Sequence, residues 1–378
     1  MAQVSLNEIF AQTLRDHLQP VSQALADPKV SDILVNGASE VYVERAGRLH
    51  QTQLRFPDEA ALDSAVRNIA QFVGKSISAE QPLLDARLPD GARVTVIMPP
   101  VARQGIYLAI RKFQREVMNI EKLVQLQTLS EETAEFLGVC VASSRNLLVT
   151  GGTGSGKTSL LNVLSTRIPL DQRILVLEDS SELQLQQPHV ITLETRPPDR
   201  DGRGEVSMRD LLRTSLRMRP DRIVIGEVRG PEALDLVQAM TSGHRGSMST
   251  THANNPHDAL ARIETLCMMS DVQLPLHALR SQISSSIDLL VQIQRFPDGT
   301  RKVTHVSEVL TLTKDNSYQV TDIYRYRVVA RGKDGPIGRL ECRGVPAFAE
   351  DIRLQGIALP KAMADMAEAA RRKEDLKK

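Results

Sequence analysis

The segment from Gly151 to Thr158 reads GGTGSGKT, the full pattern of a phosphate-binding P-loop. The apolar run 147–149 precedes it and a helical pattern over 159–164 follows it, so the loop joins a strand to a helix. In that context the glycines let backbone N–H groups surround a phosphate, and the new helix directs its positive end at the anion. The flanking strand and helix disfavour the alternative of a simple glycine-rich turn.

Each residue of the loop has an expected part in binding. Lys157 is placed to reach the β- and γ-phosphates of a nucleotide, and the Thr158 hydroxyl is a candidate ligand for Mg²⁺. The other candidate nucleotide-binding residues are Gly151, Gly152, Thr153, Gly154, Ser155, Gly156 and Ser159. The loop therefore predicts a nucleoside triphosphate and Mg²⁺ as ligands.

Strand and helix patterns divide the chain into four consecutive parts: 1–115, 116–140, 141–325 and 326–378. The first part combines short apolar runs, turn signals and a helical stretch from Pro57 to about Gly74, which predicts a small α+β domain. The second part reads as a helical connector. The fourth part reads as a tail that ends in a solvated, charged helix or frayed segment.

The third part alternates strands with helices. Strands are expected at 146–150, 173–177, 190–194, 222–226, 247–251 and 288–294, with closing strands near 303–311 and 318–325. Several are continuous apolar runs, as strands buried on both faces must be. Pro231 and Pro256 open two of the helices, at positions where the first N–H group needs no partner. The expected fold class is α/β, with a mostly parallel sheet and the P-loop at the carboxyl end of a strand.

Composition excludes several classes of protein. A net charge of +1, with 5 Tyr, 7 Phe and no Trp, gives no general attraction for nucleic acid and little surface for base stacking. The widely spaced Cys140, Cys267 and Cys342 disfavour a disulfide framework or a zinc site and fit a reducing cytosol. Because no run of 18 apolar residues occurs, we expect a soluble protein that reaches a membrane only through a partner.

Three carboxylates follow the apolar strand at 173–177. Glu178, Asp179 and Glu182 lie where α/β sheets hold their ligands, so one of them could polarise an attacking water while others hold Mg²⁺ through its waters. The alternative is a helix N-terminus whose acidic residues complement the helix dipole. The nearby P-loop favours the functional interpretation.

Two further segments lie beside expected strands. Glu227 comes after the strand at 222–226 in the Walker B arrangement, with Glu in place of the usual Asp, and would bind the metal or its water shell. His244 and His252 bracket the short strand at 247–251 without the spacing of an HExxH metal site. The residues alone leave structural and catalytic roles open for both histidines.

Arginine is dense between 196 and 229, a segment called here the arginine-rich stretch. Its members are Arg196, Arg200, Arg203, Arg209, Arg213, Arg217, Arg219, Arg222 and Arg229. A solvated face, a nucleic-acid groove and a set of phosphate or subunit-interface contacts are the competing interpretations. Neighbouring acidic residues weaken the nucleic-acid case, and the fixed fork of arginine suits triphosphate recognition across a subunit boundary.

Four ordered segments carry a family resemblance: GGTGSGKT, LEDSSELQLQQPHVITLETRPP, RMRPDRIVIGEVRG and GHRGSMSTTHANNPHDALARIE. Together they resemble the traffic ATPases of type II and type IV secretion and of type IV pili. The subgroup that the chain most resembles is the CpaF-type motors of tight-adherence (Tad/Flp) pili. The first domain agrees, because VSDILVNGASEVYVER and LPDGARVTVIMPP look like the N-terminal domain of that subgroup. The resemblance covers roughly residues 8–325.

The resemblance implies roles for individual residues. Glu182 corresponds to the family's catalytic glutamate, Glu227 to its Walker B acid, and His244 and His252 to its His box. Arg93 and Arg111 lie in the first domain, where the family places arginines that reach the phosphates; this correspondence is looser.

The resemblance also implies an assembly. The expected protein is a cytoplasmic homohexamer with a RecA-like ATPase domain, which binds ATP and Mg²⁺ between its two domains and drives inner-membrane platform proteins of a pilus or secretion machine. No specific nucleic acid and no direct membrane insertion are expected. One alternative is a RecA-like nucleic-acid motor, such as a helicase or a DNA-transfer ATPase. Another is a regulatory nucleotide-binding module that hydrolyses little, which the intact Glu182 and Glu227 disfavour.

Overall fold

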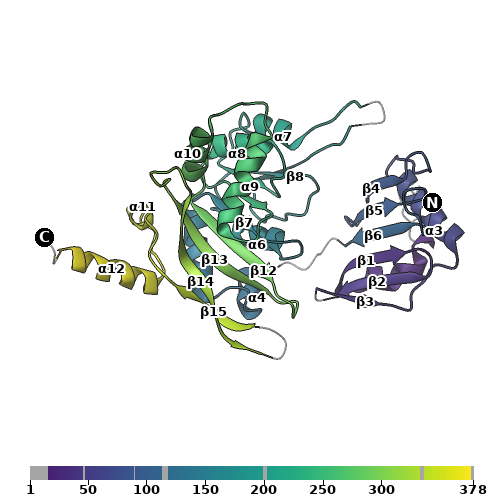
Figure 1. Ribbon diagram of the computed structural model, residues 1–378, viewed down its shortest axis with the longest axis horizontal. Coiled ribbons are helices and arrows are strands. Elements are labelled where there is room, and N and C mark those ends of the chain that lie inside the picture. The colour runs from purple at the N-terminus through teal and green to yellow at the C-terminus, as the bar shows by residue number, and fades with distance from the viewer. Residues whose placement is uncertain are drawn as a thin grey trace. The chain divides into compact units, whose positions relative to one another are not determined.

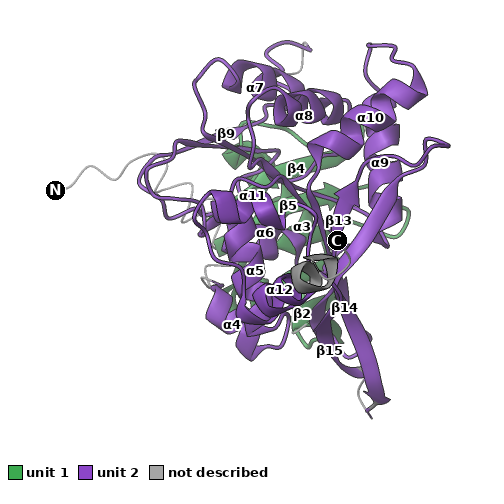
Figure 2. Cartoon of the chain, turned by 90° about the vertical axis from the view of Figure 1, so that its left-hand side faces the viewer, with its two compact units in different colours: residues 1–117 green, residues 118–378 purple. Residues whose placement is uncertain are grey.

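The computed structural model describes residues 16–45, 47–88, 90–112, 118–198, 202–332 and 336–375. The chain divides into two compact units, Met1–Val117 and Met118–Lys378, which Figure 2 shows in green and purple. The first unit holds a smaller antiparallel sheet and the second a large mixed sheet with helices. This architecture confirms the expected α/β fold class with a smaller α+β unit before it.

The first unit is built on a six-stranded antiparallel sheet in the order β3-β2-β1-β6-β5-β4. Its strands are β1 (Val30–Asn36), β2 (Glu40–Arg45), β3 (Arg48–Gln51), β4 (Leu83–Arg87), β5 (Arg93–Ile97) and β6 (Tyr107–Arg111); its helical segments are η1 (Gln19–Val21), α2 (Ser22–Ala26) and α3 (Glu59–Phe72). Helix α3 begins where the Asp58 side chain accepts the N–H of Ala61. Its apolar face, including Leu62, Val66 and Ile69, joins the buried core of this unit.

The second unit is built on a nine-stranded sheet in the order β15-β14-β13-β12-β7-β11-β10-β8-β9 (Figure 1). Its strands are β7 (Leu147–Thr150), β8 (Ile174–Glu178), β9 (Val190–Glu194), β10 (Arg222–Ile225), β11 (Met248–Thr251), β12 (Leu289–Arg295), β13 (Arg301–Leu310), β14 (Gln319–Arg331) and β15 (Pro336–Cys342). Strands β7 to β12 pair in parallel and β13 to β15 pair antiparallel. The first six strands begin and end within one residue of the positions expected from the sequence.

Helices cover both faces of this sheet. They are α4 (Ile120–Gln125), α5 (Glu131–Ala142), α6 (Lys157–Ser165), α7 (Met208–Ser215), α8 (Glu232–Thr241), α9 (Pro256–Met268), α10 (Leu276–Ser286), α11 (Ala349–Leu354) and α12 (Lys361–Asp375). Successive residues of β7 serve different cores: Leu147 and Val149 pack with α5 and α6, whereas Leu148 packs with α8, α9 and α10. This alternation explains why β7 is apolar throughout. Within the described ranges, no helix is both long and apolar enough to span a bilayer.

The structure differs from the sequence analysis at both ends of this unit. The segment expected as a connector forms α4 and α5, whose Leu123 and Phe136 are buried in the core of the second unit. The sheet, expected to end at 325, continues through the rest of β14 and β15. Part of the expected tail is also packed, because Ile352 and Met363 are buried in the same core. Because these apolar residues are widely spaced among charged residues, the sequence shows no apolar periodicity that would predict a packed helix here.

A buried arginine explains one glycine of the fold. Arg222 begins β10, is 1% exposed, and donates through Nε to Gln172 (2.5 Å) and through Nη2 to the Val141 carbonyl (2.9 Å). Burial lowers its pKa to about 10. Gly246, in the turn before β11, has a φ of +79° and lies so close that a Cβ atom would collide with the guanidinium. Only glycine fits here.

We expect Gly246→Ala to lower the free energy of unfolding by about 2–4 kcal/mol, because the added methyl group strains the backbone and displaces a buried guanidinium. Gly243→Ala is the matched control. Gly243 lies in the same turn at a φ of +106°, and no atom lies within 4 Å of its Cβ position. Gly243→Ala should therefore lower the free energy of unfolding only through backbone strain, by about 1–2 kcal/mol. Urea unfolding of the two variants measures the difference, and equal losses would contradict the packing argument.

Candidate functional site

Parallel pairing gathers four segments at one edge of the large sheet. Strands β7, β11, β10 and β8 are consecutive neighbours and run in the same direction, so their carboxyl ends lie together. The P-loop follows β7, His252 follows β11, Glu227 follows β10, and Glu178 ends β8. The motifs of the sequence therefore meet in space because of strand order, although up to 100 residues of chain separate them.

The P-loop backbone requires its glycines. Gly154 and Gly156 have φ values of +68° and +94°, and Gly156 caps the amino end of α6. Gly151 passes so close to β12 that a Cβ atom would collide with the Ile293 carbonyl oxygen. The loop leads directly into the first turn of α6, whose N–H groups have no partners within the helix. This is the geometry of an anion-binding helix terminus.

Lys157 is held inside the loop. It is 7% exposed, and its Nζ donates to the Gly152 carbonyl at 3.2 Å and lies 3.4 Å from Nδ1 of His252. Burial lowers the pKa of Lys157, and the carboxylates of Glu227 and Glu182 oppose that shift. The lysine therefore brings a desolvated positive charge to the place where the loop would receive a phosphate.

Glu227 lies at the centre of a charged network. Its Oε1 is 2.9 Å from Nε2 of His252, and its Oε2 is 2.5 Å from Nη2 of Arg229. Arg229 also approaches Asp179, with 3.6 Å between Nη1 and Oδ2. Burial, assisted by the charge of Lys157, lowers the pKa of His252, so the imidazole is neutral at neutral pH. The Glu227 carboxylate is thus paired with Arg229 on one side and lies next to His252 on the other.

The implied Mg²⁺ fits the oxygen atoms at this edge. Although Nε2 of His252 lies 2.9 Å away, the buried Oε1 of Glu227 has no hydrogen-bond partner among the described residues. Half-buried Thr158 lies in the first turn of α6. No group of three His, Cys, Asp or Glu side chains in the described part of the chain is close enough to hold a metal alone. Mg²⁺ suits such a site, because it keeps several waters and binds substrate phosphates.

The three acids after β8 have different environments. Glu178 is 3% exposed, and its Oε1 accepts the N–H groups of both Glu182 and Leu183 at 3.0 Å. Burial raises its pKa to about 7. Asp179 faces Arg229, whereas half-buried Glu182 contributes to the electrostatic environment of Lys157. Glu178 therefore positions the backbone of this loop, and the catalytic role of Glu182 stays a prediction.

Two arginines beside the P-loop were not expected from the sequence. Arg301, the first residue of β13, donates through Nε to the Gly154 carbonyl at 3.0 Å. Arg295, the last residue of β12, places Nη1 3.2 Å from the position that a Cβ on Gly154 would take. The two arginines flank one tight turn, and this turn is the only feature of the sequence that indicates that they lie near each other. Their role was not predictable because the sequence does not show that β12 lies next to β7.

The structure does not bring the two histidines together. His244 precedes β11 and His252 follows it, so they lie at opposite edges of the sheet. The His244 carbonyl accepts the Ser247 hydroxyl at 2.8 Å, and its buried Nδ1 has no hydrogen-bond partner among the described residues. This placement corrects the expectation that both histidines serve one site, since the two ends of a strand cannot share an edge.

Arg93 and Arg111 face each other in the first unit. They are register partners on β5 and β6, and Nε of Arg111 lies 3.1 Å from Oδ1 of Asp32. Register partners share one face of the sheet, so the two positive charges lie on the same face. Their approach to a nucleotide phosphate stays a prediction.

The arginine-rich stretch does not form one continuous basic surface. Arg209 and Arg213 both pair with Asp235 of α8 at 2.8 Å, Arg222 is buried, and Arg200 lies outside the described residues. Internal pairing of this kind weakens the interpretation as a nucleic-acid groove.

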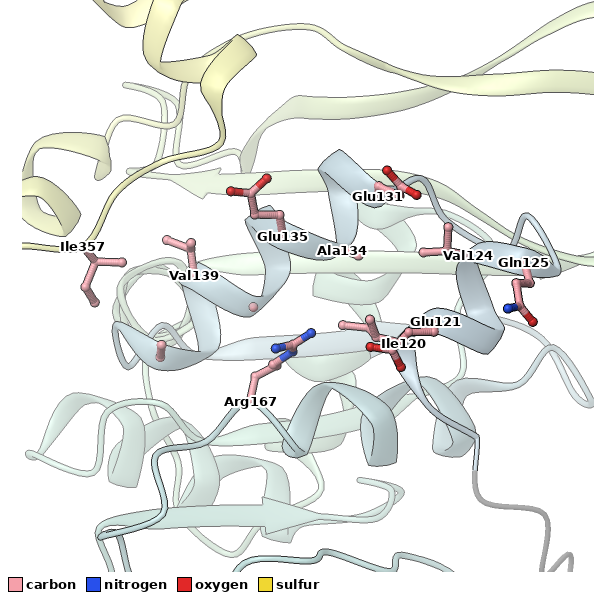
Figure 3. A pocket seen from close by; sticks show the side chains of 12 residues that line it. Ile120, Glu121, Val124, Gln125, Glu131, Ala134, Glu135, Val139, Arg167 and Ile357 are labelled. Carbon is pink, nitrogen blue, oxygen red and sulfur yellow. The ribbon is translucent and has the colours of Figure 1, made fainter.

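A separate pocket of about 650 Å³ lies beside α4 and α5 (Figure 3). Ile120, Val124 and Val139 line it, and Glu135 and Arg167 add charge. Its lining contains none of the residues expected to bind nucleotide. The pocket is therefore separate from the expected nucleotide-binding residues.

Glu178 gives a direct test of the loop geometry. Glu178→Gln keeps an acceptor for both N–H groups, so we expect near wild-type turnover, whereas Glu178→Ala should lose about 10²-fold in turnover because Glu182 is no longer held.

The carboxyl group of Glu178 in the folded wild type also holds its proton up to about pH 7. Unfolding releases that proton, so stability should fall by roughly 3 kcal/mol as pH rises from about 4.5 to 7.

The pH dependence of the unfolding temperature measures this second effect, which should be missing in Glu178→Gln. If the Gln and Ala variants lose turnover equally, Glu178 does not act through its acceptor oxygen.

Comparison with known proteins agrees with this geometry. The family model described as type II/IV secretion system protein matches residues 15–339. A putative conjugal transfer protein of Mycobacterium tuberculosis is 35% identical over 283 residues, which cover 73% of this chain and 80% of the relative. The type IV secretion system protein PtlH of Bordetella pertussis is 36% identical over 309 residues, which cover 74% of this chain and 89% of the relative.

The fold also matches a solved structure. The X-ray structure of the Legionella pneumophila ATPase DotB aligns with a TM-score of 0.54 at 18% identity, over 81% of this chain and 82% of that one. At this identity the match concerns the fold alone. The family match over most of the chain and the P-loop site lead to one conclusion: the chain belongs to the type II/IV secretion ATPase superfamily.

Proposed function

We propose that this protein is a cytoplasmic, homohexameric motor that hydrolyses ATP to assemble or retract a Tad/Flp-type pilus or to drive a related secretion machine. The observation that carries the proposal is the meeting of Lys157, Glu227 and His252 at one sheet edge in a chain of this superfamily. The CpaF-type subgroup is supported by the resemblance of the four ordered segments and of the first domain.

The residues divide the work of hydrolysis. The P-loop binds the phosphates, and Lys157 neutralises charge on the β- and γ-oxygens. Thr158 and Glu227 would hold Mg²⁺, partly through water, and the ion supplies charge neutralisation during phosphoryl transfer. Glu182 orients or deprotonates the attacking water, in a loop that Glu178 holds. Neutral His252 steadies Glu227.

Motion requires both units of the chain. We assign Arg93 and Arg111 to the phosphates of a nucleotide bound at the P-loop, so that ATP clamps the first domain onto the second and hydrolysis releases the clamp. Repeated in a ring, this cycle would act on inner-membrane platform proteins. The motor would be associated with the membrane through those partners and would not insert into it.

The main rival is a DNA-transfer ATPase, because one relative is named a putative conjugal transfer protein. The net charge of +1, the few aromatic residues and the internally paired arginines disfavour it. Several-fold stimulation of turnover by single-stranded DNA, with steep salt dependence, would favour the rival instead.

Glu182→Gln tests the chemistry. The amide keeps the shape of the side chain but cannot accept a proton from water, so turnover should fall by about 10²–10⁴-fold while ATP binding stays near wild type. Lys157→Ala is the comparison variant and should lose binding as well as turnover. Steady-state phosphate release and equilibrium ATP binding separate the two. If Asp179→Asn abolishes turnover while Glu182→Gln retains it, the catalytic assignment is wrong.

Mixed assemblies test the ring. Adding Glu182→Gln subunits to wild type should depress activity more than the same volume of buffer, because a stalled site also blocks the motion of its neighbours. Specific activity should rise over the concentration range in which light scattering detects hexamers. A strictly linear loss with mutant fraction, or full activity in a monomer, would falsify the coupled ring and leave an uncoupled ATPase.

A further inference from the structure

The side chain of Arg229 joins the acids of two neighbouring strands. Its Nη2 lies 2.5 Å from Glu227, which follows β10, and its Nη1 lies 3.6 Å from Asp179, which follows β8. The Arg229 side chain is 54% exposed and that of Glu227 16%. A solvent-accessible cation therefore neutralises a carboxylate that is mostly buried, at the edge of the sheet that carries the P-loop.

The backbone under Arg229 is fixed. The N–H groups of Arg229 and Gly230 both donate to Oε1 of buried Glu232 at 2.8 Å. The N–H of Val228 donates to the carbonyl of Thr250 on β11 at 2.9 Å. Because neighbouring elements hold the chain on both sides, a change at this position must come from rotation of the Arg229 side chain and not from movement of the loop.

We propose that Arg229 is the resident counter-ion of Glu227 and that Mg²⁺ must displace it when Mg²⁺ and nucleotide bind. The inference rests on the proposed function, which assigns Glu227 to the water shell of Mg²⁺. Two cations at contact distance from one carboxylate repel each other strongly in a partly desolvated site. Arg229 is therefore a positioning residue: it sets the Mg²⁺ concentration at which nucleotide binds, and it keeps the empty site from taking up a divalent cation alone.

The sign of the effect separates this role from a structural one. Loss of a purely structural contact would weaken binding, whereas loss of a competing cation should strengthen the response to Mg²⁺. We expect Arg229→Gln to lower the Mg²⁺ concentration for half-maximal binding of a fluorescent, non-hydrolysable ATP analogue by about three- to tenfold. Arg229→Met, which keeps the aliphatic stem, should shift it equally, and Arg229→Lys, which keeps the charge, should stay close to wild type.

Arg353→Gln is the matched control. Arg353 on α11 also pairs with a carboxylate, with 2.6 Å between Nη2 and Oε1 of Glu350, and is similarly exposed at 61%. It removes the same charge from an ion pair outside the P-loop edge, so its Mg²⁺ midpoint should equal that of wild type. A shift in this control as large as that in Arg229→Gln would overturn the proposal, because net charge alone would then account for it.

Two failures are distinguishable. If wild type binds the analogue but both neutral Arg229 variants keep or raise the Mg²⁺ midpoint, Arg229 is not a competitor and only this inference is overturned. If wild type binds no analogue at any Mg²⁺ concentration, the nucleotide site itself is wrong, and this inference falls with the proposed function.

Discussion

The parallel pairing of β7, β11, β10 and β8 is the constraint on which the site depends. Leu148 of β7 lies opposite Ser249 of β11, and β10 and β8 continue the same direction. All four strands end at the same edge of the sheet. The phosphate loop, the histidine and the acidic residues that follow these strands therefore lie close together, although they are far apart in the sequence. Apolar cores on both faces hold these strands in place. The chemistry is therefore a consequence of sheet order.

Alternating charge organises that edge. Lys157, neutral His252, Glu227, Arg229 and Asp179 form a continuous series of contacts that spans the ends of all four strands. Opposite charges in a partly desolvated site stabilise one another. A nucleotide that brings negative phosphates, together with Mg²⁺, must rearrange this series. In the proposed mechanism, binding is coupled to motion of side chains, because hydrogen bonds to neighbouring elements fix the backbone around Arg229.

The sequence was sufficient for what depends on local pattern. Continuous apolar runs predicted the parallel strands, and the P-loop, Glu227 and His252 were located correctly at strand ends. Properties that depend on packing were not predictable. The sequence alone does not distinguish the structural role of Glu178, which accepts hydrogen bonds from two backbone N–H groups, from the roles of the other acidic residues in its loop.

Three-dimensional order accounts for the other differences. Arg301 reaches the P-loop only because β12 pairs with β7, and neither the sequence nor its periodicity shows strand order. His244 shares a motif with His252 but lies across a strand from it. The end of β14 was missed because Val328, Val329 and Ala330 are consecutive apolar residues, which interrupt the alternation that marks a half-buried strand.

A structure of Glu182→Gln bound to ATP and Mg²⁺ tests the central claim most directly. We expect the phosphates to lie against residues 151–158, Mg²⁺ to lie beside Thr158 and Glu227, and the guanidinium of Arg229 to have left Glu227. A nucleotide bound away from the P-loop, or Mg²⁺ bound while the Arg229–Glu227 contact persists, would contradict the account.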